Sequence, residues 1–373
     1  MSGVRHGAGL LSGYETIMEK QRDYRIDLVK ACALFFVICV HFFYNGTFYG
    51  TPIEGKRMLI MMVMRNLFMS CVPLFIMVSG YLSRHFAWDR KLPVRFLNVW
   101  ITYLLCGAVC MAFQTVVLHK AAQASMLESV FDRLIHFDAA PYGWYVEMYL
   151  GLLLLMPFLN VIVQHTMRSQ LRSCVIALGL LTLLPYAVPD YAFFDHWVDL
   201  YPVFYYMLGA YIGEYRVMLD TRRKRMASVI ALAALAVVWG IFNFSDYRGR
   251  NFLWEARNGY NGIVIAISTC LIFLLVHSVP VERMPGLVRR LIRRISGLTL
   301  PAFLLSYCFD QIVYPRLNAV FPEAYRQLVF FPGVVLLVFV CSLLSAQGIS
   351  WCAGLMMKPV RWVFLGKPVD GKE

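Results

Sequence analysis

The sequence predicts an all-α protein, a polytopic integral membrane bundle of about ten transmembrane helices with both termini in the cytoplasm. Its 373 residues are 60% hydrophobic, whereas soluble domains are about 45–50% apolar. Apolar stretches of about 20 residues, the length that crosses a bilayer, follow one another along nearly the whole chain. The expected spans are residues 26–45, 58–82, 96–118, 142–164, 173–189, 198–215, 227–244, 258–280, 297–316 and 329–355.

Basic residues are distributed unevenly between alternate loops, and this predicts the orientation of the spans. Of the 35 Lys and Arg residues, 24 fall in the two tails and the loops of one side, and 9 fall in the loops of the other. Basic residues favour the cytoplasmic side in short loops. Both termini are therefore expected inside. The net charge of +13 follows from this asymmetry, and no nucleic-acid partner is expected.

One membrane domain accounts for the chain. We expect a cytoplasmic N-terminal tail over residues 1–24, a transmembrane domain over 25–356 and a cytoplasmic C-terminal tail over 357–373. The first tail lacks the short apolar run of a signal peptide, so the first span is expected to be retained as an anchor. All ten cysteines fall within expected spans, which indicates no extracellular disulfide framework.

Turn and charge signals mark the ends of several spans. The first span ends in an Asn45-Gly46 turn, and the inner loops 216–226 and 281–295 are strongly basic. Residues 287–295 (LVRRLIRRI) alternate apolar and basic side chains, a pattern typical of a surface helix against anionic lipid headgroups. Membrane lipids are therefore expected partners.

The first span carries charge where a lipid-facing helix would carry none. Asp27 and Lys30 stand near its inner end, and His41 follows Lys30 by eleven residues. Eleven residues make about three helical turns, so Lys30 and His41 share a face and are separated by a rise of about 16 Å. Ionisable residues within a membrane are costly and usually mark a site. The alternative for Asp27 and Lys30 is a local pair at i, i+3.

Three further spans place an ionisable residue at a depth similar to that of His41. These residues are Arg65 in the second span, Glu147 in the fourth and Asp310 in the ninth, while Arg95 begins the third span on the inner side. The arrangement predicts a passage with chemistry in its outer half and a cationic mouth at its inner end. Histidine is the side chain best suited to take and return a proton near neutral pH.

Structural roles remain open for the same residues. Arg65 with Glu147 or Asp310 would form a buried ion pair that fixes helix packing, and His41 alone would be a hydrogen-bonded core histidine. No HExxH or CxxC spacing indicates a metal site, and no GxSxG elbow, P-loop or dinucleotide motif is present.

Two features of the second span concern its backbone. Pro73 removes a helical hydrogen bond and is expected to kink the span. The pair Ser79-Gly80 is small enough for close helix packing, and we weigh that interpretation equally with a role for Ser79 in the site.

Four motifs in order resemble the membrane-bound acyltransferase 3 family. Lys30 and His41 match its signature of a basic residue, ten residues and a histidine in the first span. Residues 72–82 (VPLFIMVSGYL) resemble its second-span Pro-Leu-Phe…Ser-Gly motif, 91–100 (KLPVRFLNVW) its Arg-x-x-Arg segment, and 143–159 its Trp-Tyr…Pro-Phe-Leu span. The resemblance covers essentially the whole chain and indicates a stand-alone member without the soluble domain that some members carry.

Two positions depart from the family pattern. Lys30 stands where the family usually has Arg, so the charge is kept while the bidentate guanidinium fork is lost. Asn98 stands where the second Arg of Arg-x-x-Arg would be, which leaves Arg95 alone in that segment.

The resemblance implies a multi-pass acyltransferase of the cell inner (plasma) membrane. It would move an acyl group, commonly acetyl from acetyl-CoA, to a hydroxyl of an envelope glycan or lipid-linked sugar, with no metal. The implied general base is His41, with Glu147 or Asp310 orienting its imidazole. The residues expected to bind the CoA donor are Lys30, Arg95, Asp27 and Ser79.

Two other functions fit the same residues. A transporter or flippase for a sugar-containing or anionic substrate would line its path with these charges, although no internal repeat of the kind common in secondary transporters is visible. A signalling or scaffold protein without chemistry is the third possibility. CoA thioester turnover requires the enzyme, whereas counterflow in sealed vesicles requires a carrier.

Overall fold

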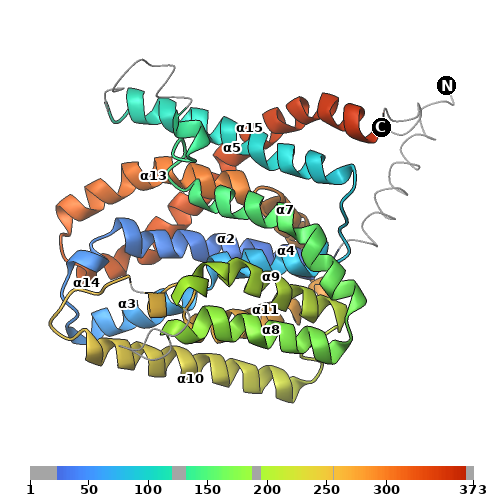
Figure 1. Cartoon of the computed structure of the whole chain (residues 1–373). Coiled ribbons are helices and arrows are strands. Elements are labelled where there is room, and N and C mark those ends of the chain that lie inside the picture. The colour runs from blue at the N-terminus through green and yellow to red at the C-terminus, as the bar shows by residue number, and fades with distance from the viewer. Residues whose placement is uncertain (1–22, 120–131, 187–194, 255, 367–373) are drawn as a thin grey trace.

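The computed structural model is an all-helical bundle (Figure 1) and describes residues 23–119, 132–186, 195–254 and 256–366. Two isolated β-bridges join Pro52 to Asn251 and Ile53 to Arg248. The α-helices are α2 (Tyr24–Asn45), α3 (Gly55–Phe68), α4 (Cys71–Ser83), α5 (Lys91–Val116), α7 (Trp144–His165), α8 (Arg168–Leu183), α9 (Tyr201–Glu214), α10 (Arg222–Asp246), α11 (Ile263–His277), α12 (Gly286–Gly297), α13 (Thr299–Val320), α14 (Ala324–Gln327) and α15 (Phe331–Leu365). The 3-10 helices are η1 (Phe48–Gly50), η2 (Leu184–Tyr186), η3 (Asp195–Leu200), η4 (Ala256–Asn258), η5 (Val281–Arg283) and η6 (Leu328–Phe330).

Six helical stretches of the described chain are long and apolar enough to cross a membrane. Each of the ten ranges expected from the sequence overlaps a helix. However, α8, α9 and α11 have only 16, 14 and 15 residues, fewer than the about 20 that cross a bilayer, and α13, although 22 residues long, is not among the six. The chain is a multi-pass membrane protein, and the count of ten spans stays a prediction. The six stretches are Tyr24–Gly50, Gly55–Ser83, Lys91–Val116, Trp144–His165, Arg222–Asp246 and Ala324–Leu365.

The second expected span is two helices rather than one kinked helix. α3 ends at Phe68, and α4 begins at Cys71. Pro73 therefore stands in the first turn of α4, where its missing N–H removes no bond because the first amides of a helix have no intrahelical partner. Proline at this position favours the start of a helix, and this explains why the chain breaks before Pro73 instead of kinking at it.

The helix α2 lies in the middle of the bundle (Figure 1) and contacts α3, α4, α11, α12, α13 and α15. Thirteen of its 22 residues are buried, Asp27 and His41 among them. The polar side chains of this helix are therefore surrounded by protein, where other helices supply their hydrogen-bond partners.

Close backbone contact joins α4 to α9. A Cβ atom added at Gly80 would lie 1.9 Å from the carbonyl oxygen of Tyr206, and one added at Gly209 would lie 2.0 Å from that of Met77. Only glycine fits at such distances, so the packing interpretation of the Ser79-Gly80 pair accounts for Gly80.

The predicted surface helix over 287–295 is α12. Its Ile292 and Ser296 are buried against the bundle, whereas Leu287 and Leu291 are exposed. This helix packs against α2, near the end of α2 that carries Asp27.

Candidate functional site

His41 stands one turn before the C-terminal end of α2. Asp23 caps the start of this helix by accepting a hydrogen bond from the backbone N–H of Arg25 at 3.0 Å, and the helix continues to Asn45 without a break. Because the helix is continuous, Lys30 and His41 keep the shared face expected from the sequence, with about 16 Å of rise between them.

A carboxylate from α13 faces the imidazole. Nδ1 of His41 lies 3.0 Å from Oδ2 of Asp310, and the two residues are 7% and 0% exposed. With the carboxylate ionised and the imidazole uncharged, Nδ1–H donates to Oδ2 of Asp310, because an ionised carboxylate can only accept. In this tautomer Nε2 keeps its lone pair, which is the form of histidine that can accept a proton.

Three more side chains hold the His41–Asp310 pair. The hydroxyl of Tyr142 donates to Oδ2 of Asp310 at 2.8 Å, and its ring centroid lies 4.2 Å from that of the imidazole. Nδ2 of Asn45 in turn donates to the Tyr142 hydroxyl at 3.2 Å. Oγ of Ser306 lies 3.2 Å from Nδ1 of His41 and donates to a carbonyl three residues earlier in α13. The orientation of the imidazole is therefore fixed by contacts from α2, α13 and the turn that precedes α7.

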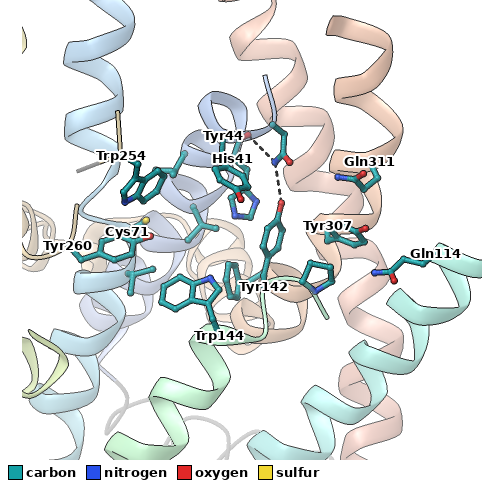
Figure 2. A pocket seen from close by; sticks show the side chains of 16 residues that line it. His41, Tyr44, Cys71, Gln114, Tyr142, Trp144, Trp254, Tyr260, Tyr307 and Gln311 are labelled. Atoms are coloured by element: carbon teal, nitrogen blue, oxygen red, sulfur yellow. Dashed lines mark hydrogen bonds between the residues drawn. The ribbon is translucent and has the colours of Figure 1, made fainter. Parts of the chain in front are cut away.

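His41 lines a cavity of about 600 Å³, within the range of about 300–1,000 Å³ that is usual for ligand sites. Figure 2 shows Trp254, Tyr260 and Cys71 on one side of His41, and Tyr307, Gln311 and Gln114 on the other. The lining is mainly aromatic and apolar with a few amides. Its residues are Val37, Val40, His41, Tyr44, Asn45, Cys71, Val72, Gln114, Pro141, Tyr142, Trp144, Trp254, Tyr260, Phe303, Tyr307 and Gln311.

A smaller apolar cavity of about 50 Å³ adjoins the first. Val37, Val72 and Phe303 line both cavities, and we call these three side chains the neck. Val37 precedes His41 by one turn of α2, so the smaller cavity lies toward the end of the helix that carries Lys30. The remaining residues of its lining are Phe75, Tyr145, Thr299 and Leu300.

The structure brings only one of the two candidate carboxylates to His41. Asp310 contacts the imidazole, whereas Glu147 is exposed on α7 and lies outside the cavity lining. Glu147 stands at i+5 from Tyr142 and one turn into α7, where its neighbours Val146 and Leu150 are buried but Glu147 itself is exposed.

The expected ion pair of Arg65 is absent from the described part of the chain, where no carboxylate lies within ion-pair distance of it. Arg65 is fully buried. Its Nε donates to the hydroxyl of Tyr49 at 3.1 Å and its Nη1 to the carbonyl oxygen of Asn258. Its guanidinium carbon lies 4.9 Å from the centre of the Trp254 ring. Aromatic faces and a carbonyl dipole, which attract a cation, thus surround this charge.

Two of the residues expected to bind the donor make structural contacts. Asp27 is buried and accepts a hydrogen bond from Oγ of Ser296 at 2.6 Å, which ties α2 to α12. Ser79 donates to the carbonyl oxygen of Phe75, one turn earlier in α4, at 3.0 Å. Both residues lie outside the linings of the two cavities.

The other two expected donor-binding residues are the cations Lys30 and Arg95. They lie at the end of the bundle where α2 begins, which we call the Lys30 end. Lys30 is half-buried on α2, and Arg95 is exposed on the first turns of α5. The guanidinium of Arg95 lies 4.0 Å from the centre of the Phe86 ring, and its Nη1 lies 3.3 Å from Oγ of Ser83. The guanidinium therefore has a fixed position with part of its surface open to a ligand.

The sequence patterns do not single out Tyr142, Asn45 or Ser306. Ser306 precedes Asp310 by four residues and so shares a helix face with it, a spacing that could have indicated a polar pair facing His41. Tyr142 fits an interfacial aromatic belt equally well, and nothing local in the sequence indicates its contact with a residue 168 positions away.

Comparison with known protein families gives a match that covers most of the chain. A family model described as an acyltransferase domain matches residues 23–347. No curated protein and no solved structure matches the chain. The matched range begins just before α2 and ends within α15, so it contains every residue of the His41 cavity.

Proposed function

This chain belongs to the acyltransferase 3 family, and on that basis we propose that it is an O-acyltransferase that uses acyl-CoA, in the first place acetyl-CoA. The acceptor is a hydroxyl of a cell-surface glycan or lipid-linked sugar. The observation that carries the proposal is the His41–Asp310 pair at the wall of a 600 Å³ cavity. We further propose the inner membrane as its location, with the termini and the Lys30 end of α2 on the cytoplasmic side.

In the proposed reaction Nε2 of His41 is the general base. It takes the proton of the acceptor hydroxyl while the hydroxyl oxygen attacks the carbonyl carbon of the thioester. The tetrahedral intermediate then collapses, the carbon–sulfur bond breaks, and the imidazolium gives its proton to the departing CoA sulfur. Asp310 stabilises the imidazolium through Nδ1–H, as the third member does in triad-like sites, and Tyr142 holds Asp310 in place.

The proposed donor enters from the Lys30 end. Lys30 and Arg95 supply positive charge for the phosphates of CoA. From there the pantetheine arm follows the face of α2 through the neck to His41, over about 16 Å. The apolar lining of the small cavity suits an uncharged thioester arm, whereas the phosphates stay at the cationic mouth.

The family match favours acyl transfer over the transporter alternative. A carrier must move its whole substrate through the bundle, whereas the proposed reaction passes only the thioester arm between the two cavities. In acyl transfer the His41–Asp310 pair acts on the acceptor hydroxyl.

The test is acyl transfer by the purified protein in sealed vesicles of known orientation. Labelled acetyl-CoA is supplied on one side and a saccharide acceptor on the other. We expect acylated acceptor only when acetyl-CoA is on the side of the protein's C-terminus. Saccharide counterflow without consumption of thioester would establish a carrier instead, and product formed with acetyl-CoA only on the opposite side would refute the proposed orientation.

Replacing Arg95 with alanine is expected to raise the KM for acetyl-CoA more than it lowers kcat, because a phosphate contact contributes to ground-state binding and not to the chemistry. The KM increase should shrink at high salt, where the lost contact is screened. The neighbouring exposed Arg90→Ala is the matched control. A loss of kcat in Arg95→Ala at unchanged donor KM would place Arg95 in the chemistry instead.

Lys30→Arg should keep or improve donor binding, because the guanidinium fork suits phosphate.

A further inference from the structure

Large aromatic side chains surround the end of the cavity near the C-terminus of α2. Tyr44, Trp144 and Trp254 all line the cavity, yet they are 59%, 40% and 42% exposed. They come from three separate parts of the chain: α2, the first turn of α7 and the segment between α10 and η4. Partly exposed rings that face a cavity are available to a ligand, unlike rings packed in the core.

Trp144, Tyr260 and Trp254 form one continuous aromatic wall (Figure 2). The rings of Trp144 and Tyr260 are 6.0 Å apart and nearly parallel, at 22°, while Trp254 meets Tyr260 edge to face at 6.4 Å. The backbone of Tyr260 is held in turn, because its carbonyl oxygen accepts a hydrogen bond from Tyr205 at 2.7 Å. The wall is therefore fixed before any ligand enters.

Arg65 holds the Trp254 end of this wall. The guanidinium lies over the indole ring at 4.9 Å and over the Phe252 ring at 5.1 Å, and it is anchored by the Tyr49 hydroxyl and the Asn258 carbonyl. A fully buried cation is costly to keep in a membrane protein. Arg65 belongs to α3, and its side chain reaches the segment that carries Trp254, so its role is to fix Trp254 at the cavity.

The chemistry of the lining indicates which kind of ligand the wall binds. Among the residues that the structure describes, the lining contains no Lys, Arg, Asp or Glu, and apart from the His41 imidazole its polar groups are amides, phenols, indoles and a thiol. Flat aromatic faces match the C–H faces of a pyranose ring, and the amides of Gln311 and Asn45 match its hydroxyls. A carboxylate or phosphate on the ring would meet no Lys or Arg among these described lining residues, and burying a charge without a partner is costly.

We propose that the Trp144–Tyr260–Trp254 wall is the acceptor subsite and that it binds an uncharged pyranose. This inference rests on the proposed function and adds the charge of the acceptor ring and the residues that hold it. Stacking on the wall leaves one edge of the sugar toward Nε2 of His41, so the wall also selects the hydroxyl that is acylated. Arg65 is a positioning residue that acts through Trp254.

The test compares Trp254→Ala and Trp144→Ala with Trp197→Ala. Trp197 is 49% exposed on η3 and lies outside the cavity lining, so it is the matched control for a tryptophan at the membrane interface. We expect the KM for a methyl hexopyranoside to rise roughly tenfold in the two wall variants, which corresponds to about 1.4 kcal/mol, with an unchanged KM for acetyl-CoA. Trp254→Phe should recover part of the loss. Wall variants that behave like Trp197→Ala would overturn the proposal.

A second arm measures the preference for charge. In His41→Ala, which slows turnover, quenching of tryptophan fluorescence should report binding of the methyl hexopyranoside and weaker binding of the matching hexuronic acid, and Trp254→Ala in this background should weaken hexopyranoside binding roughly tenfold. Tighter binding of the hexuronic acid would overturn the uncharged assignment. This arm needs no catalysis, so saccharide binding without any acyl transfer by the wild type would refute the proposed function while supporting the subsite.

Discussion

Replacing His41 with alanine is expected to slow acyl transfer to a sugar hydroxyl by about 10²–10⁴-fold, the usual loss when a general base is removed. Among the described residues of the lining, the imidazole is the group suited to take the hydroxyl proton, and its Nδ1 is already bonded to Asp310. The thioester should still bind, because the Lys30 and Arg95 end of the bundle is untouched. The measurement is kcat with saturating acetyl-CoA and acceptor, alongside the KM for each.

Hydroxylamine separates the loss of a base from a damaged site. This strong nucleophile attacks thioesters without help in losing a proton, so acyl transfer to hydroxylamine should fall far less in His41→Ala than transfer to a sugar. His41→Gln is the second variant, because an amide keeps much of the size and polarity of the imidazole. Transfer to a sugar at the wild-type rate in either variant, with the protein inserted normally, would remove His41 from the mechanism.

Replacing Asp310 with asparagine is expected to produce a loss of similar order, roughly 10²–10⁴-fold in kcat, although Asp310 does not touch the substrate. The asparagine amide can donate to Nδ1, which selects the tautomer with the proton on Nε2 and removes the lone pair that faces the cavity. It also removes the negative charge that stabilises the imidazolium. The effect should therefore appear in kcat, with little change in the KM for either substrate.

Tyr142→Phe provides the graded control for Asp310. It removes one of the two hydrogen bonds to Oδ2 and keeps the ring that lies against His41, so a smaller loss is expected. Hydroxylamine should again bypass much of the defect in Asp310→Asn, which a general loss of packing would not allow. An Asp310→Asn protein that loses transfer to hydroxylamine as severely as transfer to sugars would show that Asp310 serves the fold rather than the base.

Hydropathy predicts much of the fold because each long helix must present an apolar surface to lipid. It does not resolve the break at Phe68 to Cys71, since both halves of the 58–82 range are apolar and only the local position of Pro73 separates them. The sequence predicts full spans where the short helices α8, α9 and α11 lie, because apolar residues continue into the segments that follow these helices.

The candidate site is predictable in part. His41 and Asp310 stand out because an ionisable group in an apolar helix is exceptional. The sequence does not show which way a charged residue turns, since the lipid-facing side of such a helix is as apolar as the buried side and no amphipathic stripe marks the interior. Glu147 could therefore not be distinguished from Asp310. The aromatic wall gave no signal, because 27 Phe, 21 Tyr and 8 Trp residues are spread over the chain.

The neck also affects the electrical insulation of the membrane. A cell membrane maintains an ion gradient, and moving one charge across 100 mV corresponds to about 2.3 kcal/mol. A water-filled cavity of 600 Å³ that continued to the Lys30 end would discharge that gradient. Val37, Val72 and Phe303 line both cavities, and an apolar constriction at this point would shed water and so block ions. An uncharged acyl thioester can pass such a barrier while protons and salts cannot, so the acyl group would cross the membrane without a leak current.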